Sequence, residues 1–294
     1  MSLPLALVAC SEQHAGEAAS RDLSAERWAE ACEDWDEWDK PGPPFRVHGN
    51  TYYVGTCGIA AVLIAGEEGH VLIDGGTAEG AALIAANIEA LGFDLEDVEF
   101  LLHSHEHFDH VAGLAELQRR SGARLIASKA AAPVLSTGED APSDPQYGMH
   151  EPFPAAEVSA VVENGETVRQ GGLELTAIAT PGHAAGALSW RWESCAEEGC
   201  ETIVYADSLS PVSSDDYRFS DHPAYVEAYE AGLDRLAASP CTILLTPHPS
   251  ASGMRTKIEG GEGLRDEAAC ARYAERVRTR LRVRLAQENE PAGD

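Results

Sequence analysis

The sequence predicts an α/β protein in which helix, sheet, sheet and helix form a four-layer unit with two similar halves. Short β-rich runs alternate with helical segments along the whole of the 294 residues. No shift in composition and no Pro/Gly/Ser-rich linker divides the chain. Hydrophobic residues make up 44% of it, which is enough apolar material for a sizeable core. We therefore expect a single domain over 21–294, which is large enough to be a complete catalytic domain.

The first 20 residues have the character of an export signal. An apolar run ends at Cys10, and Leu7-Val8-Ala9-Cys10 is similar to a bacterial lipobox, in which the cysteine becomes a lipidated N-terminus. The alternative is the remnant of an ordinary signal peptide. Both interpretations predict a periplasmic or secreted protein, and the first adds a lipid anchor at Cys10 in the outer membrane. The run is too short to span a bilayer.

The first half of the chain reads as a helix, a group of strands, and then alternating helices and strands. Lys40-Pro-Gly-Pro-Pro44 ends the first helix, and Gly92 ends the next because glycine tolerates the backbone found at a helix C-terminus. In chain order we expect a helix at 24–35, strands within 45–74, a helix at 78–91, a buried strand at 98–104 and a helix at 112–120.

The second half begins with a long loop at 137–155, which is rich in Pro, Gly, Ser and Asp. Its last helix carries an apolar stripe at four-residue spacing for docking, and we interpret the arginines at 272, 276, 278, 280, 282 and 284 as a solvated face. A net charge of −28 argues against a nucleic-acid partner, because such a surface repels phosphate. The expected elements are strands at 173–179, 186–193, 201–207 and 242–246 and helices at 223–238 and 263–288.

Residues 103–110, with the sequence His-Ser-His-Glu-His-Phe-Asp-His, predict a metal centre. At the end of an extended strand alternate side chains point the same way, so His105 and His107 can bind one ion together. Asp109 and His110 follow where the chain turns into a helix, and they can bind a second ion. Burying these donors is costly unless a cation accepts their lone pairs. His103 lies on the same strand face, and we expect it to be a packed or solvated histidine.

Two further histidines follow later strands, His183 in Thr180-Pro-Gly-His183 and His248 in Leu245-Thr-Pro-His-Pro249. With the first cluster they make six ligands, which divide as three and three and leave each ion room for water, as in a catalytic zinc site. Imidazole and carboxylate donors without thiolate suit Zn²⁺. We therefore expect two zinc ions per chain.

The pattern His-x-His-x-Asp-His, preceded by Leu72-Ile-Asp-Gly75, resembles the metallo-β-lactamase superfamily, and within it the third subclass of the class B β-lactamases. The similarity runs from about Phe45 to the last helix. Ser208 stands where the first subclass has a cysteine ligand, and His105 stands where the second has asparagine. The resemblance implies the αβ/βα sandwich of the metallo-β-lactamase fold. It also implies hydrolysis of the β-lactam amide bond of penicillins, cephalosporins and carbapenems, hence antibiotic resistance.

The same resemblance implies a role for each site residue. A hydroxide held by two ions attacks the lactam carbonyl without a covalent enzyme intermediate, and Asp109 orients it. Ser208 and Ser210 match hydroxyls near the second zinc and the substrate carboxylate, and Tyr217 is placed near the oxyanion. Ala184 departs from the family, which often has a hydroxyl residue there. The ligands implied for the first ion are His105, His107 and His183, and those for the second are Asp109, His110 and His248.

Two other functions stay open. A thioester hydrolase of the glyoxalase II type bridges its metals with an aspartate, and Asp207 in Ala206-Asp-Ser-Leu209 can be aligned with it; a lactonase belongs to the same group of alternatives. The export features argue against this, since glutathione thioesters are cytosolic. A non-catalytic zinc-binding module would saturate its ions with protein ligands, whereas three per ion leave positions open.

Seven cysteines suit an exported chain with three disulfides and one cysteine left over. Cys195 and Cys200 flank a short connection between two predicted strands, which suggests a hairpin bridge. By the family resemblance, Cys241 and Cys270 pin the last helix, and Cys32 and Cys57 then tie the N-terminal helix to the first sheet. Cys10 remains as the lipid candidate. No oligomer interface is indicated, so a monomer with a small-molecule substrate is the default expectation.

Overall fold

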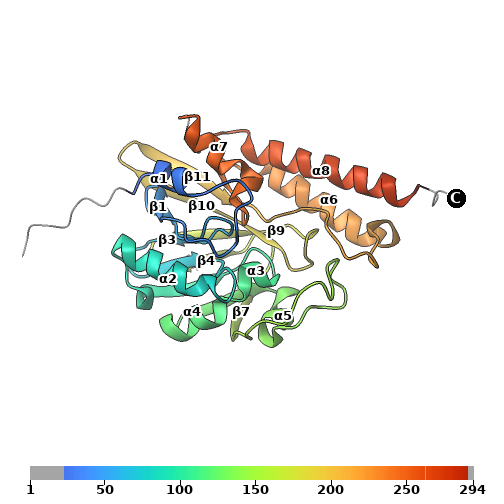
Figure 1. Cartoon of the computed structure of the whole chain (residues 1–294), viewed down its shortest axis with the longest axis horizontal. Coiled ribbons are helices and arrows are strands. Elements are labelled where there is room, and N and C mark those ends of the chain that lie inside the picture. The colour runs from blue at the N-terminus through green and yellow to red at the C-terminus, as the bar shows by residue number, and fades with distance from the viewer. Residues whose placement is uncertain (1–22, 262, 291–294) are drawn as a thin grey trace, which may run out of the picture.

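Two β-sheets pack face to face, and helices cover the outer face of each (Figure 1). The computed structural model describes residues 23–261 and 263–290. The predicted export segment at 1–20, with Cys10, lies outside these residues. Within them, no helix is long and apolar enough to cross a membrane. The four-layer α/β class expected from the sequence is confirmed.

The first sheet has seven strands in the order of the chain. Its first four strands pair antiparallel, and the fourth to the seventh pair parallel. The strands are β1 (Phe45–His48), β2 (Thr51–Tyr53), β3 (Val62–Ile64), β4 (His70–Ile73), β5 (Val98–Leu102), β6 (Arg124–Ser128) and β7 (Val158–Val162). The accompanying helices are α1 (Ala25–Ala31), α2 (Gly80–Leu91), η1 (Leu95–Asp97), α3 (Phe108–Val111), α4 (Leu114–Ser121) and α5 (Ala131–Thr137).

The second sheet has five strands in the order β12-β11-β10-β9-β8. Its strands are β8 (Thr167–Gln170), β9 (Leu173–Ala179), β10 (Leu188–Ala196), β11 (Gly199–Tyr205) and β12 (Ile243–Leu245). The helices of this half are η2 (Phe219–Asp221), α6 (Pro223–Ala238), η3 (Pro249–Ser252), α7 (Met254–Glu259) and α8 (Ala269–Glu288).

Two helix boundaries differ from those expected. The first helix ends at Ala31 rather than at residue 35, because Cys32 is already extended where it bonds to Cys57. The last helix begins at Ala269 rather than at 263, because Arg265 forms a β-bridge with Ile243 at the edge of the second sheet. The predicted helix at 112–120 corresponds to α4, and a further short helix, α3, precedes it within the histidine motif.

Three apolar clusters hold the layers together. One fills the space between the two sheets, one packs α2, α4 and α5 on the first sheet, and one packs α6 and α8 on the second. Tyr273, Val277 and Leu281 of the predicted stripe are buried in the third cluster, which fixes α8 against the second sheet. The disulfides join the expected pairs, Cys32–Cys57, Cys195–Cys200 and Cys241–Cys270.

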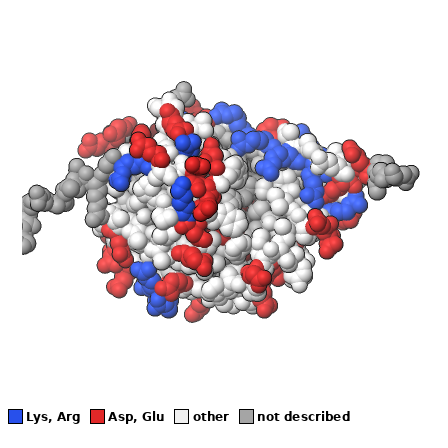
Figure 2. Space-filling view, in the orientation of Figure 1, with Lys and Arg blue, Asp and Glu red and all other residues white. Residues whose placement is uncertain are grey.

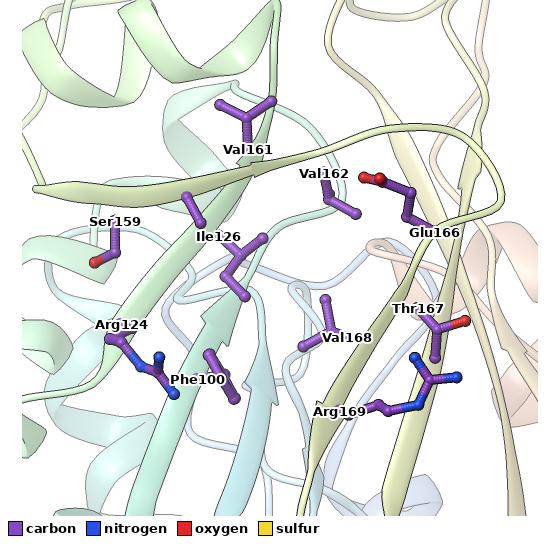
Figure 3. Close-up of a pocket in the computed structure, with 11 residues that line it drawn as sticks. Phe100, Arg124, Ile126, Ser159, Val161, Val162, Glu166, Thr167, Val168 and Arg169 are labelled. Carbon is purple, nitrogen blue, oxygen red and sulfur yellow. The ribbon is translucent and has the colours of Figure 1, made fainter.

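The edge strands β7 and β8 leave a pocket of about 510 Å³ between the sheets (Figure 3). Phe100, Ile126 and Val168 form its apolar floor, and the guanidinium of Arg124 lies 4.3 Å from the centre of the Phe100 ring. This is a place where the inter-sheet core approaches the surface. The predicted metal ligands line a different cavity.

Candidate metal centre

The loops that follow β5, β9 and β12 bring the six predicted ligands together. Two buried carboxylates hold these loops. Asp74, at the end of β4 with a positive φ of 66°, accepts hydrogen bonds from the backbone N–H (2.6 Å) and hydroxyl (2.8 Å) of Ser104 and from the hydroxyl of Tyr205 (2.7 Å). Glu106 accepts one from the N–H of Gly186 at 2.7 Å, and burial raises the pKa of Glu106 to about 7. The histidine loops are thereby tied to β4, to β11 and to each other.

His105, His107 and His183 form the first triplet. Each pair of rings has its centroids 4.7 or 4.8 Å apart, and one nitrogen of each lies within 4.8 Å of the others. All three side chains are buried. Among the described residues Nε2 of His105 has no hydrogen-bond partner, which is unfavourable for a buried polar atom unless it has a ligand.

Asp109, His110 and His248 form the second triplet. Oδ2 of Asp109 lies 3.0 Å from Nε2 of His110 and 3.4 Å from Nε2 of His248. Burial alone would raise the pKa of Asp109, but the two imidazoles hold it well below the usual value, so the carboxylate is ionised. Within the described structure both ring nitrogens of His110 lack a hydrogen-bond partner.

These donors fit zinc. Each triplet offers imidazole nitrogen or carboxylate oxygen, there is no thiolate in either, and three ligands leave one tetrahedral position open. The unpartnered nitrogens of His105 and His110 are the atoms that a cation would satisfy. The arrangement is that of two adjacent, open metal positions.

The remote nitrogen of each imidazole in the first triplet lies near a protein oxygen. Nδ1 of His105 is 2.8 Å from Oδ1 of Asp207, Nε2 of His107 is 3.1 Å from Oδ1 of Asp144, and Nδ1 of His183 is 2.9 Å from the Ser210 carbonyl. Such contacts fix the ring and its tautomer. Burial opposes the charged form of His107, but Asp144 outweighs it and raises the pKa of the metal-free imidazole to about 9.

Sequence reasoning missed Asp144 and Gln146. Both lie in the predicted loop at 137–155, and Nε2 of Gln146 is 3.3–3.5 Å from ring nitrogens of His107 and His183. A carboxylate in a loop 37 residues from the histidine that it contacts leaves no periodic signal. The sequence indicates only that 137–155 is a long loop.

The two predicted serines lie at the site, whereas Tyr217 does not. Ser208 and Ser210 line the cleft, and the Ser210 hydroxyl is 3.0 Å from Nδ1 of His183. Tyr217 instead stacks on His222, with ring centroids 4.4 Å apart, and packs against Phe219. Tyr217 is therefore not among the residues that line the cleft, and its place near the oxyanion stays a prediction.

His103 is a packed histidine. Its Nε2 accepts a hydrogen bond from the backbone N–H of Ser128 at 3.0 Å, and its side chain is fully buried. Burial lowers its pKa to about 3, so the ring is neutral. The residue joins β5 to β6 behind the metal ligands.

Four of the six ligands, His107, Asp109, His183 and His248, line a cleft of about 550 Å³, and His105 and His110 are buried beneath it. Trp35 and Trp38 form one wall, near the His248 ring, and α8 forms another. Trp35 is 69% exposed, an unusual position for so large an apolar side chain on a protein surface. The cleft thus combines metal-type donors with apolar contact area, as small-molecule sites do.

A family model described as the metallo-beta-lactamase superfamily matches residues 54–248, which include all six ligands. The chain belongs to this superfamily. The solved MIM-2 metallo-β-lactamase is 57% identical over 90% of this chain and 97% of that chain, with a TM-score of 0.87. MIM-1 from Novosphingobium pentaromativorans is 46% identical over 89% of this chain and 97% of that chain, also with a TM-score of 0.87.

A curated hydroxyacylglutathione hydrolase of Acidiphilium cryptum (strain JF-5) is also similar. It is 32% identical over 217 residues, which cover 72% of this chain and 75% of that protein. The identity to the solved β-lactamases is higher and extends over more of both chains. Among these superfamily members the chain therefore lies nearer to the β-lactamases.

Proposed function

We propose that this protein is a β-lactamase that uses two zinc ions to hydrolyse the lactam amide bond of penicillins, cephalosporins and carbapenems. The observation that carries the proposal is the pair of adjacent triplets, each of which contributes two ligands to the lining of one cleft. The high identity to solved metallo-β-lactamases along nearly the whole described chain supports the choice of substrate.

His105, His107 and His183 would hold one zinc ion, and Asp109, His110 and His248 the other. When bound, the ions supply an activated water and polarise the carbonyl. Asp109 is ionised and can accept a hydrogen bond from the attacking water. As the C–N bond of the lactam opens, the amide nitrogen takes up a proton, which Asp109 is placed to relay.

The remaining groups position ligands and substrate. Asp207 and Asp144 hold His105 and His107 in orientation. Ser208 and Ser210 line the cleft, and we propose that the Ser210 hydroxyl donates a hydrogen bond to a substrate carboxylate, whereas the Ser208 hydroxyl is buried behind it. No side chain of the site needs to form a covalent bond with the substrate.

A second candidate, thioester hydrolysis, is supported by the similarity to hydroxyacylglutathione hydrolase. The contacts of Asp207 speak against it. Its Oδ1 lies near His105, and its Oδ2 accepts a hydrogen bond from the N–H of Leu209 at 3.0 Å. The backbone thus occupies Oδ2, while Oδ1, 2.8 Å from Nδ1 of His105, has no hydrogen-bond partner among the described residues. We infer that Asp207 orients His105 rather than bridging two ions.

We also infer that the chain is exported and acts as a monomer. Three disulfides among the described residues suit an oxidising compartment such as the periplasm. Lipidation at Cys10 belongs to this proposal, and mass spectrometry of the protein from a bacterial membrane fraction tests it. A cytosolic protein with six free thiols would contradict the inference.

The activity is tested with zinc-loaded protein on a chromogenic cephalosporin, a carbapenem and lactoylglutathione. We expect β-lactam turnover that a chelator abolishes and that added zinc restores. Turnover of the thioester without turnover of either lactam would reject the β-lactamase assignment in favour of the second candidate. Absence of turnover on all three would reject both.

A further inference from the structure

One wall of the cleft is a face of α8 that carries two arginines. Tyr273, Arg276, Val277 and Arg280 all line the cleft, and their spacing of three and four residues places them on one side of the helix. Tyr273 and Val277 are buried against the second sheet, whereas the two arginines are exposed. Lys and Arg side chains gather along α8 in the space-filling view (Figure 2).

The charge of the cleft is opposite to that of the whole protein. The chain has 49 acidic and 21 basic residues, so most of its surface repels anions. The residues that line the cleft include two arginines, Arg276 and Arg280, and one carboxylate, Asp109. Because Asp109 belongs to a metal triplet, its charge is offset when the triplet is filled. An anion that reaches this cleft therefore meets positive rather than negative side chains.

The other arginines of α8 are engaged by carboxylates. Arg272 pairs with Asp266, Arg278 with Glu230 and Asp234, and Arg284 with Glu288. In the described part of the chain, no carboxylate oxygen lies within 4.0 Å of the Arg280 guanidinium, which is the distance limit for an ion pair.

Arg276 is held by uncharged groups. It donates a hydrogen bond to the Ala251 carbonyl at 2.5 Å, and its guanidinium lies 5.2 Å from the centre of the Tyr273 ring. Neither contact neutralises its charge. Two arginines on the cleft wall thus keep charge available to a ligand.

This wall adjoins the predicted serines. The Tyr273 hydroxyl donates to the Ser208 carbonyl at 2.6 Å, so the helix face and the serine loop are directly joined. We propose that Arg280, supported by Arg276, forms a subsite that determines substrate specificity. Its guanidinium binds the carboxylate of anionic lactams and attracts them into the cleft. The proposal rests on the proposed function. The Ser210 hydroxyl supplies a hydrogen bond, and the guanidinium supplies the charge that a hydroxyl lacks.

The test compares R280A with R282A. Arg282 is a matched control, because it lies on the same helix and R282A removes the same charge. Its side chain is 64% exposed and lies 4.0 Å from Glu275. We expect R280A to raise KM for an anionic cephalosporin about 10-fold, or about 1.4 kcal/mol, with kcat within about 2-fold of wild type. KM for the neutral methyl ester should not change. The anionic substrate should also lose much of its salt dependence in R280A, and R282A should behave as wild type.

Three outcomes reject the subsite or separate it from the activity. The subsite would be overturned if R280A and R282A had equal KM values for the anionic cephalosporin. It would also be overturned if R280A raised KM equally for the anionic cephalosporin and for its neutral methyl ester. Calorimetric binding of the hydrolysed, anionic lactam to zinc-loaded wild type, R280A and R282A gives a readout without turnover. Suppose that the wild type hydrolyses no lactam, but that R280A binds the hydrolysed lactam more weakly than the wild type and R282A do. The subsite would then stand, and the proposed function would be rejected.

Discussion

The two triplets are built in different ways. In the first, each imidazole has its remote nitrogen within 3.1 Å of a separate protein oxygen, and all three rings are buried. In the second, one oxygen of Asp109 lies near both His110 and His248, and the His248 side chain is 20% exposed. The first triplet is preorganised by independent contacts, whereas the second depends on a single carboxylate.

This difference has a structural origin. The oxygens that support the first triplet come from two loops: the loop after β11 carries Asp207 and Ser210, and the loop after α5 carries Asp144. His248 is carried by the short connection between β12 and η3, near the solvent-exposed Trp35 and Trp38. We infer that the first position binds its metal more tightly and that the second is more easily emptied.

The largest effect is expected at Asp109. D109N keeps the size of the side chain but removes the charge next to His110 and His248, so the second position should lose its metal. We expect a loss of about 1000-fold in kcat with one zinc per chain instead of two, measured by lactam turnover and elemental analysis. D215N, at an exposed position, is the control and should keep both metals. Full activity in D109N would show that the second triplet is not the one that the structure indicates.

The identity of the six ligands could be predicted from the sequence, because they lie in local motifs directly after strands. The strand pattern and the His-x-His-x-Asp-His spacing were enough to place His105, His107, Asp109 and His110 at one edge. The contacts that distinguish the triplets were not predictable. Asp144 reaches His107 only because an irregular loop folds over the site.

Tyr217 shows another limit of motif reasoning. The family resemblance implies a role at the oxyanion, but it does not predict the aromatic packing with His222 and Phe219 that the structure shows. Likewise, the sequence alone indicates one solvated arginine face on the last helix. Only the docking of α8 shows that Arg276 and Arg280 line the cleft while their neighbours pair with carboxylates.

A smaller effect is expected from the disulfide behind the second triplet. Cys241 precedes β12, the strand that leads to His248, and it is bonded to Cys270 on α8 with a separation of 29 residues. Replacing both by serine should lower the free energy of unfolding by about 3.5 kcal/mol, measured by denaturant titration. The second metal should also be lost more readily than the first.

The Cys195–Cys200 bridge is the matched comparison, because it closes a separation of only 5 residues at the tip of the β10–β11 hairpin. Its removal should cost about 2 kcal/mol and leave the affinities of both metals unchanged. Equal effects of the two replacements on metal binding would remove the link between Cys241–Cys270 and the second triplet.

The smallest effect, and the sharpest test of the comparison, is expected at Asp144. D144N should weaken metal binding at the first position about 10- to 100-fold, because the amide holds the His107 ring less firmly. Competition with a chelating dye measures this affinity without any substrate. In the metal-free protein the pKa of His107 should fall from about 9, since the carboxylate that stabilises the imidazolium is gone, and NMR titration of the ring reports this change.

E139Q provides the control in the same loop, at an exposed position. It should change neither the metal affinity nor the His107 titration. If D144N left the affinity of the first position unchanged while lowering the pKa of His107, Asp144 would be a neighbour of the ring without orienting it. The first triplet would then depend on Asp207 and the Ser210 carbonyl alone, and its advantage over the second would rest on burial rather than on the number of supporting contacts.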